Sequence, residues 1–288
     1  MSAGNPAQRT SPTGAGVPRP DNLLLRVASA AVLAPLAVAI AFIGGWPFVA
    51  FWGAAAIGVA FEWLRMVAAG DEITTRLVAA VALGCAAVAV ALGQFGWALT
   101  VVVAAALLIA ALSQAARRAW TLAGIVYAGA VLVAPAALRR DGEFGFVAII
   151  VLFAVVWATD ICGYFGGRVI GGPKLWARVS PKKTWAGAIS GAAGAIVAGC
   201  VVAVAAGLPS LVAVAVLAFV LSAVSQAGDL FESAVKRRFG IKDAGQLIPG
   251  HGGVMDRLDG FLAAAVAAAI IGVLKGGIAA PARALLVW

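Results

Sequence analysis

The chain is built from a series of continuous apolar segments, each close to the length that a helix needs to cross a membrane. A helix spans about 30 Å of hydrocarbon with roughly 20 residues. We therefore predict an all-α, polytopic integral membrane protein with about nine transmembrane helices. The short third and fourth segments form either two spans or one re-entrant pair. The segments are 23–44, 46–68, 77–93, 96–113, 119–138, 145–166, 185–206, 208–228 and 258–275.

The composition excludes a water-soluble globular domain. Hydrophobic residues make up 63% of the chain and charged residues 11%, against roughly 45–50% and about 25% in soluble domains. The net charge is +9, which in a soluble protein would suggest nucleic acid. In a membrane protein it indicates basic loops beside anionic lipids and anionic substrates, so no nucleic-acid partner is expected. The three cysteines have no metal-ligand spacing and support neither a disulfide framework nor a zinc site.

The basic residues predict the orientation. With a cytoplasmic N-terminus and nine spans, 17 of the 21 Lys and Arg residues lie on the inner side, as the positive-inside rule requires. The C-terminus then lies outside. Alanine- and arginine-rich usage suggests a bacterial source, and hence a multi-pass protein of the cell inner membrane. The four outer residues are Arg139, Arg140, Lys275 and Arg283.

The chain divides into a tail and one membrane domain. Residues 1–21 are rich in Pro, Gly, Ser and Thr and are predicted to be disordered. Residues 22–288 form a single membrane-embedded domain, in which 22–144 supply the N-terminal helices and 145–288 the helices and cytoplasmic loops that carry the chemistry. The first 140 residues contain few polar side chains beyond Glu62 and Arg65.

A stripe of polar residues starts inside the eighth apolar segment and continues beyond its end. Its members are three or four residues apart, which places them on one face of a helix. Such a stripe needs polar surroundings, because unsatisfied polar groups in lipid cost several kcal/mol each. For the first two serines, hydrogen bonding between helices is the alternative. The stripe comprises Ser222, Ser225, Asp229, Ser233 and Lys236.

Carboxylates at the start of the last span suit a hard divalent cation. Asp256 and Asp259 are three residues apart, so both can face one side of the helix start. Together with Asp229 they suit Mg²⁺, which takes one or two carboxylates and leaves its other positions to water and substrate phosphates. An active site at the cytoplasmic face is therefore expected.

The loop before this helix is rich in glycine. Gly252 and Gly253 let backbone N–H groups approach a phosphate ahead of a helix N-terminus, although the same glycines suit a tight turn. His251 is the single histidine and is a candidate substrate neighbour. The loop has no Walker A sequence.

A second polar segment lies between the sixth and seventh spans. Asp160 ends an apolar span, where a carboxylate is a functional candidate by default. The following loop contains Lys182, Lys183 and Thr184, which suit a triphosphate or an anionic headgroup. The positive-inside rule alone also predicts such lysines. Glycines at four-residue spacing, such as Gly163 and Gly167, predict helix packing.

Three motifs resemble the phosphatidate cytidylyltransferase, or CDP-diacylglycerol synthase, family. The longest runs over 233–259, Ser-Ala-Val-Lys-Arg-Arg-Phe-Gly-Ile-Lys-Asp-Ala-Gly-Gln-Leu-Ile-Pro-Gly-His-Gly-Gly-Val-Met-Asp-Arg-Leu-Asp, and the others are Gly-Asp-Leu-Phe-Glu at 228–232 and Ser-Pro-Lys-Lys-Thr at 180–184. The resemblance is good over 150–262. It implies that CTP and phosphatidic acid react to give CDP-diacylglycerol and pyrophosphate. It also implies a Mg²⁺-dependent site, an all-helical membrane fold and a homodimer. Whether a monovalent cation such as K⁺ lies beside Mg²⁺ is left open.

The resemblance also implies roles for individual residues. Asp229 and Asp256 correspond to metal ligands. The catalytic group comprises Ser233, Lys236, Asp256, Arg257 and Asp259. The substrate-binding group comprises Asp160, Lys182, Lys183, Thr184, Ser225, Lys242, His251, Gly252 and Gly253.

Two positions depart from the family pattern. Residue 186 is Ala where the family commonly has Glu or Gln, so no polar side chain at 186 takes part. Residue 163 is Gly where Ala usually precedes the tyrosine, and this change is expected to affect packing only.

Two other function classes are alternatives for this sequence. A cation-coupled secondary transporter would use Asp160, Asp229 and Asp256, but such transporters often consist of two repeated halves, and here the polar residues gather in one half. Another CTP-dependent membrane lipid transferase, such as a lipid-alcohol kinase, would release CDP in place of pyrophosphate.

Overall fold

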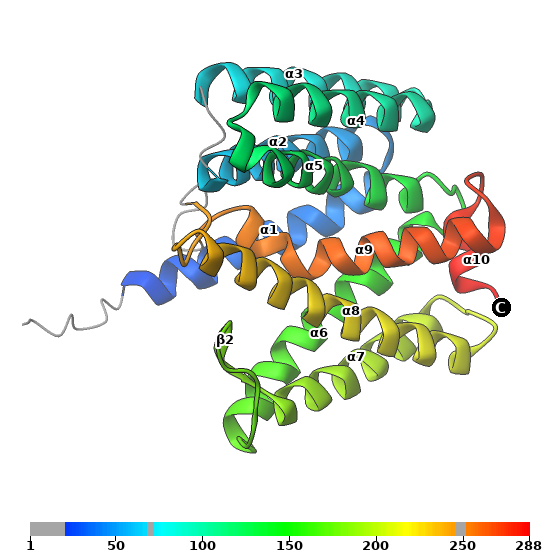
Figure 1. Cartoon of the computed structure of the whole chain (residues 1–288). Coiled ribbons are helices and arrows are strands. Elements are labelled where there is room, and N and C mark those ends of the chain that lie inside the picture. The colour runs from blue at the N-terminus through cyan, green and yellow to red at the C-terminus, as the bar shows by residue number, and fades with distance from the viewer. Residues whose placement is uncertain (1–20, 68–71, 246–251) are drawn as a thin grey trace, which may run out of the picture.

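The structure is a computed structural model that describes residues 21–67, 72–245 and 252–288. These residues form a helical bundle with one short antiparallel hairpin (Figure 1). The helices are α1 (Asp21–Ile43), α2 (Gly45–Val67), α3 (Glu72–Ala91), α4 (Phe95–Leu112), the 3₁₀ turn η1 (Ala115–Arg117), α5 (Arg118–Arg139), α6 (Gly145–Val169), α7 (Trp185–Ala205), α8 (Leu211–Arg238), α9 (Met255–Gly276) and α10 (Pro281–Leu286). The strands are β1 (Lys174–Trp176) and β2 (Ser180–Thr184).

The predicted polytopic architecture is confirmed. Eight helices within the described ranges, α2 to α9, are long and apolar enough to cross a membrane. The segments 77–93 and 96–113 form two separate helices of 20 and 18 residues, each of spanning length. The segment 23–44 falls in α1, where the apolar stretch Ala31–Ile43 is shorter than a span. The ninth span therefore stays a prediction, and of the predicted tail all but Asp21 lies outside the described residues.

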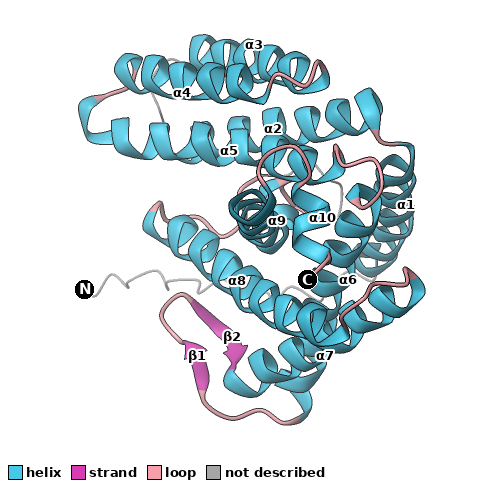
Figure 2. Cartoon of the chain, turned by 90° about the vertical axis from the view of Figure 1, so that its right-hand side faces the viewer, coloured by secondary structure: helices cyan, strands magenta, loops and turns pink. Residues whose placement is uncertain are grey.

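Helix α9 lies at the centre of the bundle. It packs against α5 on one side and α8 on another, and it separates the layered helices α2 to α5 from the group α6 to α8 (Figures 1 and 2). The hairpin and the start of α9 lie at one end of the bundle, and α10 lies at the other. The two halves predicted from the sequence thus meet along α9.

The four basic residues assigned to the outer side gather at the α10 end. Arg140 donates to the carbonyl of Ile278 at 3.3 Å, Lys275 donates to the carbonyl of Val287 at 3.1 Å, and Arg283 forms an ion pair with Glu143 at 3.5 Å. Arg139, at the end of α5, donates to carbonyls at the end of α1. These residues therefore share one end of the helical bundle.

Small residues bring α6 and α7 into close contact, as the four-residue glycine spacing predicts. A Cβ atom on Gly187 would lie 2.7 Å from the carbonyl oxygen of Gly163, and one on Gly191 would lie 2.8 Å from that of Thr159. A Cβ on Gly163 would meet its nearest atom at 3.4 Å, an ordinary contact. The family's alanine would therefore fit at 163, which agrees with a packing effect only.

The all-α prediction is wrong at one place, because the loop between α6 and α7 contains the β1–β2 hairpin. Lys174 pairs with Thr184, and Trp176 pairs with Ser180. The segment Ser-Pro-Lys-Lys-Thr lacks the alternation of apolar and polar residues that predicts strands, so its pairing depends on tertiary packing. Thr184 ends β2 and caps α7, since its hydroxyl accepts the N–H of Gly187 at 3.1 Å.

Candidate active site

Helix α8 continues beyond its apolar part and carries the predicted polar stripe on one continuous helix. At the membrane-interior end, Ser222 is buried and accepts hydrogen bonds from Thr159 at 2.8 Å and Gln226 at 3.3 Å. Ser225 is also buried and lies against Gly260 of α9. For Ser222 the bond to Thr159 favours the alternative raised above, hydrogen bonding between helices. For Ser225 the contact with Gly260 is one of packing. A substrate contact of Ser225 stays a prediction.

The hairpin brings a lysine to the middle of the stripe. Lys183 of β2 forms an ion pair with Asp229 of α8, and the Ser233 hydroxyl donates to the other oxygen of Asp229 at 3.4 Å. The side chains of Lys183 and Asp229 are both 30% exposed. This pair is therefore neutralised within the protein and still open to a ligand.

A polar cavity of about 530 Å³ opens beside this ion pair. It is enclosed by α6, the hairpin, α7 and α8, and both cationic and acidic side chains line it. Five predicted site residues belong to its wall: Asp160, Lys182, Lys183, Thr184 and Asp229.

An apolar groove of about 540 Å³ adjoins the polar cavity. It follows the surface between α7 and α8, where Ile189, Ile196 and Phe219 contribute to its lining. Leu175, Ala188 and Gln226 line both spaces. The cavity lined by charged side chains and the apolar groove are therefore neighbours, with these three side chains between them.

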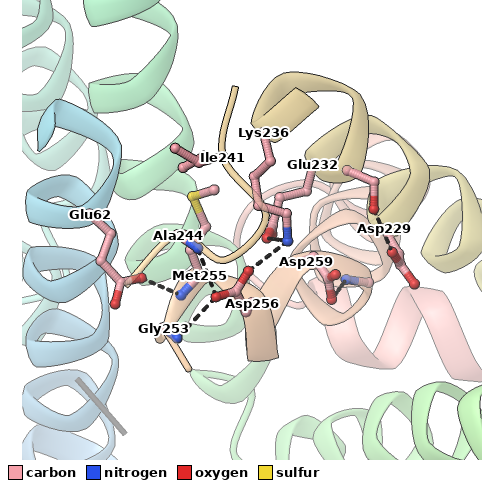
Figure 3. A network of polar contacts seen from close by, with 12 residues as sticks. Glu62, Asp229, Glu232, Lys236, Ile241, Ala244, Gly253, Met255, Asp256 and Asp259 are labelled. Carbon is pink, nitrogen blue, oxygen red and sulfur yellow. Dashed lines mark hydrogen bonds and ion pairs between the residues drawn. The ribbon is translucent and has the colours of Figure 1, made fainter. Parts of the chain in front are cut away.

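A second cluster lies at the junction of α8 and α9 (Figure 3). Lys236 lies 2.9 Å from Glu232 Oε1 on its own helix and 2.6 Å from Asp256 Oδ1 at the start of α9. The Glu232 side chain is fully buried, and those of Lys236 and Asp256 are 11% and 9% exposed. The side chains of this cluster are more deeply buried than those of Lys183 and Asp229.

Asp256 also organises the backbone around it. Its Oδ2 accepts the N–H of Ala244 at 2.9 Å and the N–H of Gly253 at 3.0 Å. Both oxygens of Asp256 are therefore engaged by protein groups. The Gly253 N–H, predicted to face a phosphate, is used in this contact.

Three carboxylates from three helices lie within electrostatic range of one another. Asp229 of α8 repels both Asp160 of α6 and Asp259 of α9, while Lys183 and Arg257 attract Asp160. Oxygen donors of this kind fit Mg²⁺, which needs one or two carboxylates beside substrate phosphates. Among the described residues, however, no group of three His, Cys, Asp or Glu side chains forms a complete metal site.

The two predicted metal ligands, Asp229 and Asp256, pair with different lysines in the structure. Asp229 pairs with Lys183 and Asp256 with Lys236, and in the view of Figure 3 Asp259 lies between them. Both carboxylates belong to one end of the bundle, as predicted, but each is neutralised by its own lysine.

The remaining predicted residues lie around these clusters. Arg257 and Lys242 are exposed, and Arg257 lies within electrostatic range of Asp160. Gly252 adopts the left-handed conformation, with φ of 87°, which requires glycine. His251 lies outside the described residues.

Two acidic residues that the sequence analysis left without a role take part in this region. Glu232 completes the pairing of Lys236, and Glu62 of α2 accepts backbone N–H groups at the start of α9. The sequence feature that could have indicated Glu62 is that a lone carboxylate in an otherwise apolar span is a functional candidate. That signal does not name the partner, which lies 193 positions away for one of the Glu62 contacts.

Comparison with known proteins identifies the family of this chain. The model of the cytidylyltransferase family matches residues 24–274. The chain is 43% identical over 256 residues to the phosphatidate cytidylyltransferase of Brucella suis, covering 88% of this chain and 94% of the relative. It is 39% identical over 126 residues to that of Bacillus subtilis, covering 43% and 47%. The chain belongs to the cytidylyltransferase family.

Proposed function

We propose that this chain is a membrane phosphatidate cytidylyltransferase, which joins CTP and phosphatidic acid to give CDP-diacylglycerol and pyrophosphate. The observation that carries the proposal is that the cavity with charged side chains adjoins the apolar groove, in a chain so similar to named enzymes of this activity. A phospholipid headgroup and a nucleotide need a polar chamber, and acyl chains need an apolar surface beside it. The two neighbouring spaces meet both requirements.

The charges in the site suit a reaction between two anions. A phosphate oxygen of phosphatidic acid forms a bond to the α-phosphorus of CTP, the bond from this phosphorus to the bridging oxygen breaks, and pyrophosphate leaves with that electron pair. A phosphate monoester is largely ionised near neutral pH, with a second pKa of about 6, so no strong general base is needed. Catalysis then rests on positioning and charge neutralisation.

The lysines supply this neutralisation. Lys183 borders the cavity and Lys236 lies at the α8–α9 junction, and each is already held by a carboxylate. Lys182, Thr184 and Arg257 are proposed to contact substrate phosphates beside them. Ser233, through its bond to Asp229, is proposed to orient that carboxylate.

Magnesium is proposed to be held by Asp229 and Asp256, with Asp259 nearby. When bound, Mg²⁺ supplies charge stabilisation to phosphate oxygens. Lys183 and Lys236 pair with these two carboxylates, so each lysine would share its carboxylate with the cation.

We also propose that the hairpin end of the bundle faces the cytoplasm, in the inner membrane, and that the chain forms a homodimer. The positive-inside rule supports the orientation, because the four outer basic residues gather at the opposite end. The homodimer rests on the family resemblance.

The function is tested with the full chain purified in detergent and supplied with phosphatidic acid, CTP and Mg²⁺. We expect CDP-diacylglycerol and pyrophosphate in equal amounts, and neither product with EDTA or in Asp256→Asn. Glu143→Gln, at the opposite end of the bundle, is the control and should behave as wild type. Release of CDP with a phosphorylated lipid would indicate a kinase, and a folded wild-type protein without either product would refute the proposal.

A further inference from the structure

Glu62 is a carboxylate placed inside the second helix, far in sequence from the clusters at α8 and α9. Its side chain is 4% exposed, in a helix whose other charged residue is Arg65. A buried carboxylate in a membrane-spanning helix is costly, so its contacts show what it stabilises.

Glu62 binds the N-terminus of α9 with both oxygens. Oε1 accepts the N–H of Val254 at 2.9 Å, and Oε2 accepts the N–H of Met255 at 2.8 Å. The first N–H groups of a helix have no partner within the helix, and a negative charge there is favoured by the helix dipole. Figure 3 shows Glu62 reaching from α2 to this point.

No side chain at the start of α9 itself supplies an N-cap, so the contact from Glu62 takes that place. Val254 is the N-cap residue and provides no side-chain hydrogen bond. Glycine allows the close approach, since a Cβ atom on Gly253 would lie 2.6 Å from a Glu62 oxygen. The cap is therefore provided by a side chain of another helix, α2.

The capped turn is the turn that presents Asp256. Asp256 immediately follows Met255 and holds Lys236 at 2.6 Å, while its other oxygen accepts the N–H of Gly253. A shift of this turn would move Asp256 relative to Lys236. The contact thus connects the N-terminal helices to the carboxylate and lysine of the site.

We propose that Glu62 is a positioning residue of the transferase: by capping α9 from α2, it holds Asp256 in place against Lys236. The inference rests on the proposed function for its kinetic part only. Its structural part, protection of the first N–H groups of α9 by a side chain of α2, can be measured without turnover.

The matched variants are Glu62→Gln and Glu62→Ala, with Glu143→Gln as the same substitution at the other end of the bundle. Glutamine keeps the shape of the side chain but replaces one acceptor with an NH₂ donor, which faces a backbone N–H donor. It therefore loses one of the two bonds and the charge. Glu62→Gln carries the test if the alanine variant does not fold.

The first readout is hydrogen–deuterium exchange of a peptide covering 252–262 in the detergent-solubilised full chain. We expect faster exchange in Glu62→Gln than in wild type, with unchanged exchange in a peptide from α4 and no change anywhere in this region for Glu143→Gln. Wild-type exchange in Glu62→Gln would overturn the inference, whatever the outcome of the activity assay.

The second readout is steady-state kinetics. A misplaced catalytic group costs on the order of 10²-fold in rate, so we expect kcat of Glu62→Gln to fall by about this factor, while KM for CTP and for phosphatidic acid changes by less than about threefold. Faster exchange with an unchanged kcat would show a purely structural cap and overturn the positioning role. An inactive wild type would refute the proposed function and leave the exchange result to decide the capping contact.

Discussion

Lys236 bridges two carboxylates that come from different helices, lying 2.9 Å from Glu232 and 2.6 Å from Asp256. One lysine thus contacts two carboxyl groups in a largely buried setting. Because Glu232 is fully buried, loss of the lysine charge would leave two carboxylates close together without compensation. This relationship makes Lys236 important both for folding and for the site.

Lys236→Met should therefore reduce stability and activity together. Removing one member of a buried ion pair costs about 3–5 kcal/mol, and removal of a preorganised charge-stabilising group costs about 10²–10³-fold in kcat. Thermal unfolding in detergent and product formation would measure both effects. Lys275→Met, at an exposed position at the opposite end of the bundle, is the control, and an equally stable Lys236→Met would contradict the burial argument.

Asp229→Asn should change the response to magnesium. If Asp229 holds the cation, the variant should need about tenfold more Mg²⁺ for half-maximal activity, a loss of about 1.4 kcal/mol in binding. The measurement is a magnesium titration of activity at saturating CTP. Asp243→Asn, at an exposed position, should titrate as wild type, and an unshifted Asp229→Asn would argue against a metal role for Asp229.

Lys183→Ala and Lys182→Ala form a matched pair on strand β2. Both lysines line the cavity, and Lys183 forms an ion pair with Asp229. We expect kcat/KM for CTP to fall by about 10–100-fold in Lys183→Ala, in the range of a lost charged contact of about 1.5–3 kcal/mol. Lys182→Ala should lose less, and equal losses would show that the pairing with Asp229 does not matter.

Gly191→Ala should destabilise the α6–α7 contact, whereas Gly163→Ala should not. The new Cβ would lie 2.8 Å from the Thr159 carbonyl oxygen at 191 and 3.4 Å from the nearest atom at 163. Overpacking costs about 1–3 kcal/mol, so the melting temperature of Gly191→Ala should be the lower of the two. Equal melting temperatures would show that the helices separate without cost.

Ala223→Trp should obstruct the apolar groove between α7 and α8, which Ala223 lines. We expect a higher KM for phosphatidic acid, by about tenfold or more for the loss of a few buried methylene groups at roughly 0.8 kcal/mol each, and an unchanged KM for CTP. Ala104→Trp, on the exposed face of α4, is the control. An unchanged KM for the lipid in Ala223→Trp would place the acyl chains elsewhere.

The sequence by itself determined the membrane helices and the polar face of α8. Segments such as 145–166 and 258–275 are recognisable because spanning a bilayer requires about 20 apolar residues in succession. The spacing from Ser222 to Lys236 predicts one helical face because the period of the helix is local geometry. Motifs read from consecutive residues likewise indicated the family.

Only the tertiary structure decided which charges meet. Lys183 and Asp229 are 46 residues apart, and Glu62 and Met255 are 193 apart, so no local pattern connects them. The hairpin could not be predicted from the sequence either, because its strands show no alternation of apolar and polar residues and form by pairing with each other. Hydrophobicity specifies that helices enter the membrane, but the partner of each buried charge depends on how close packing at small residues brings those helices together.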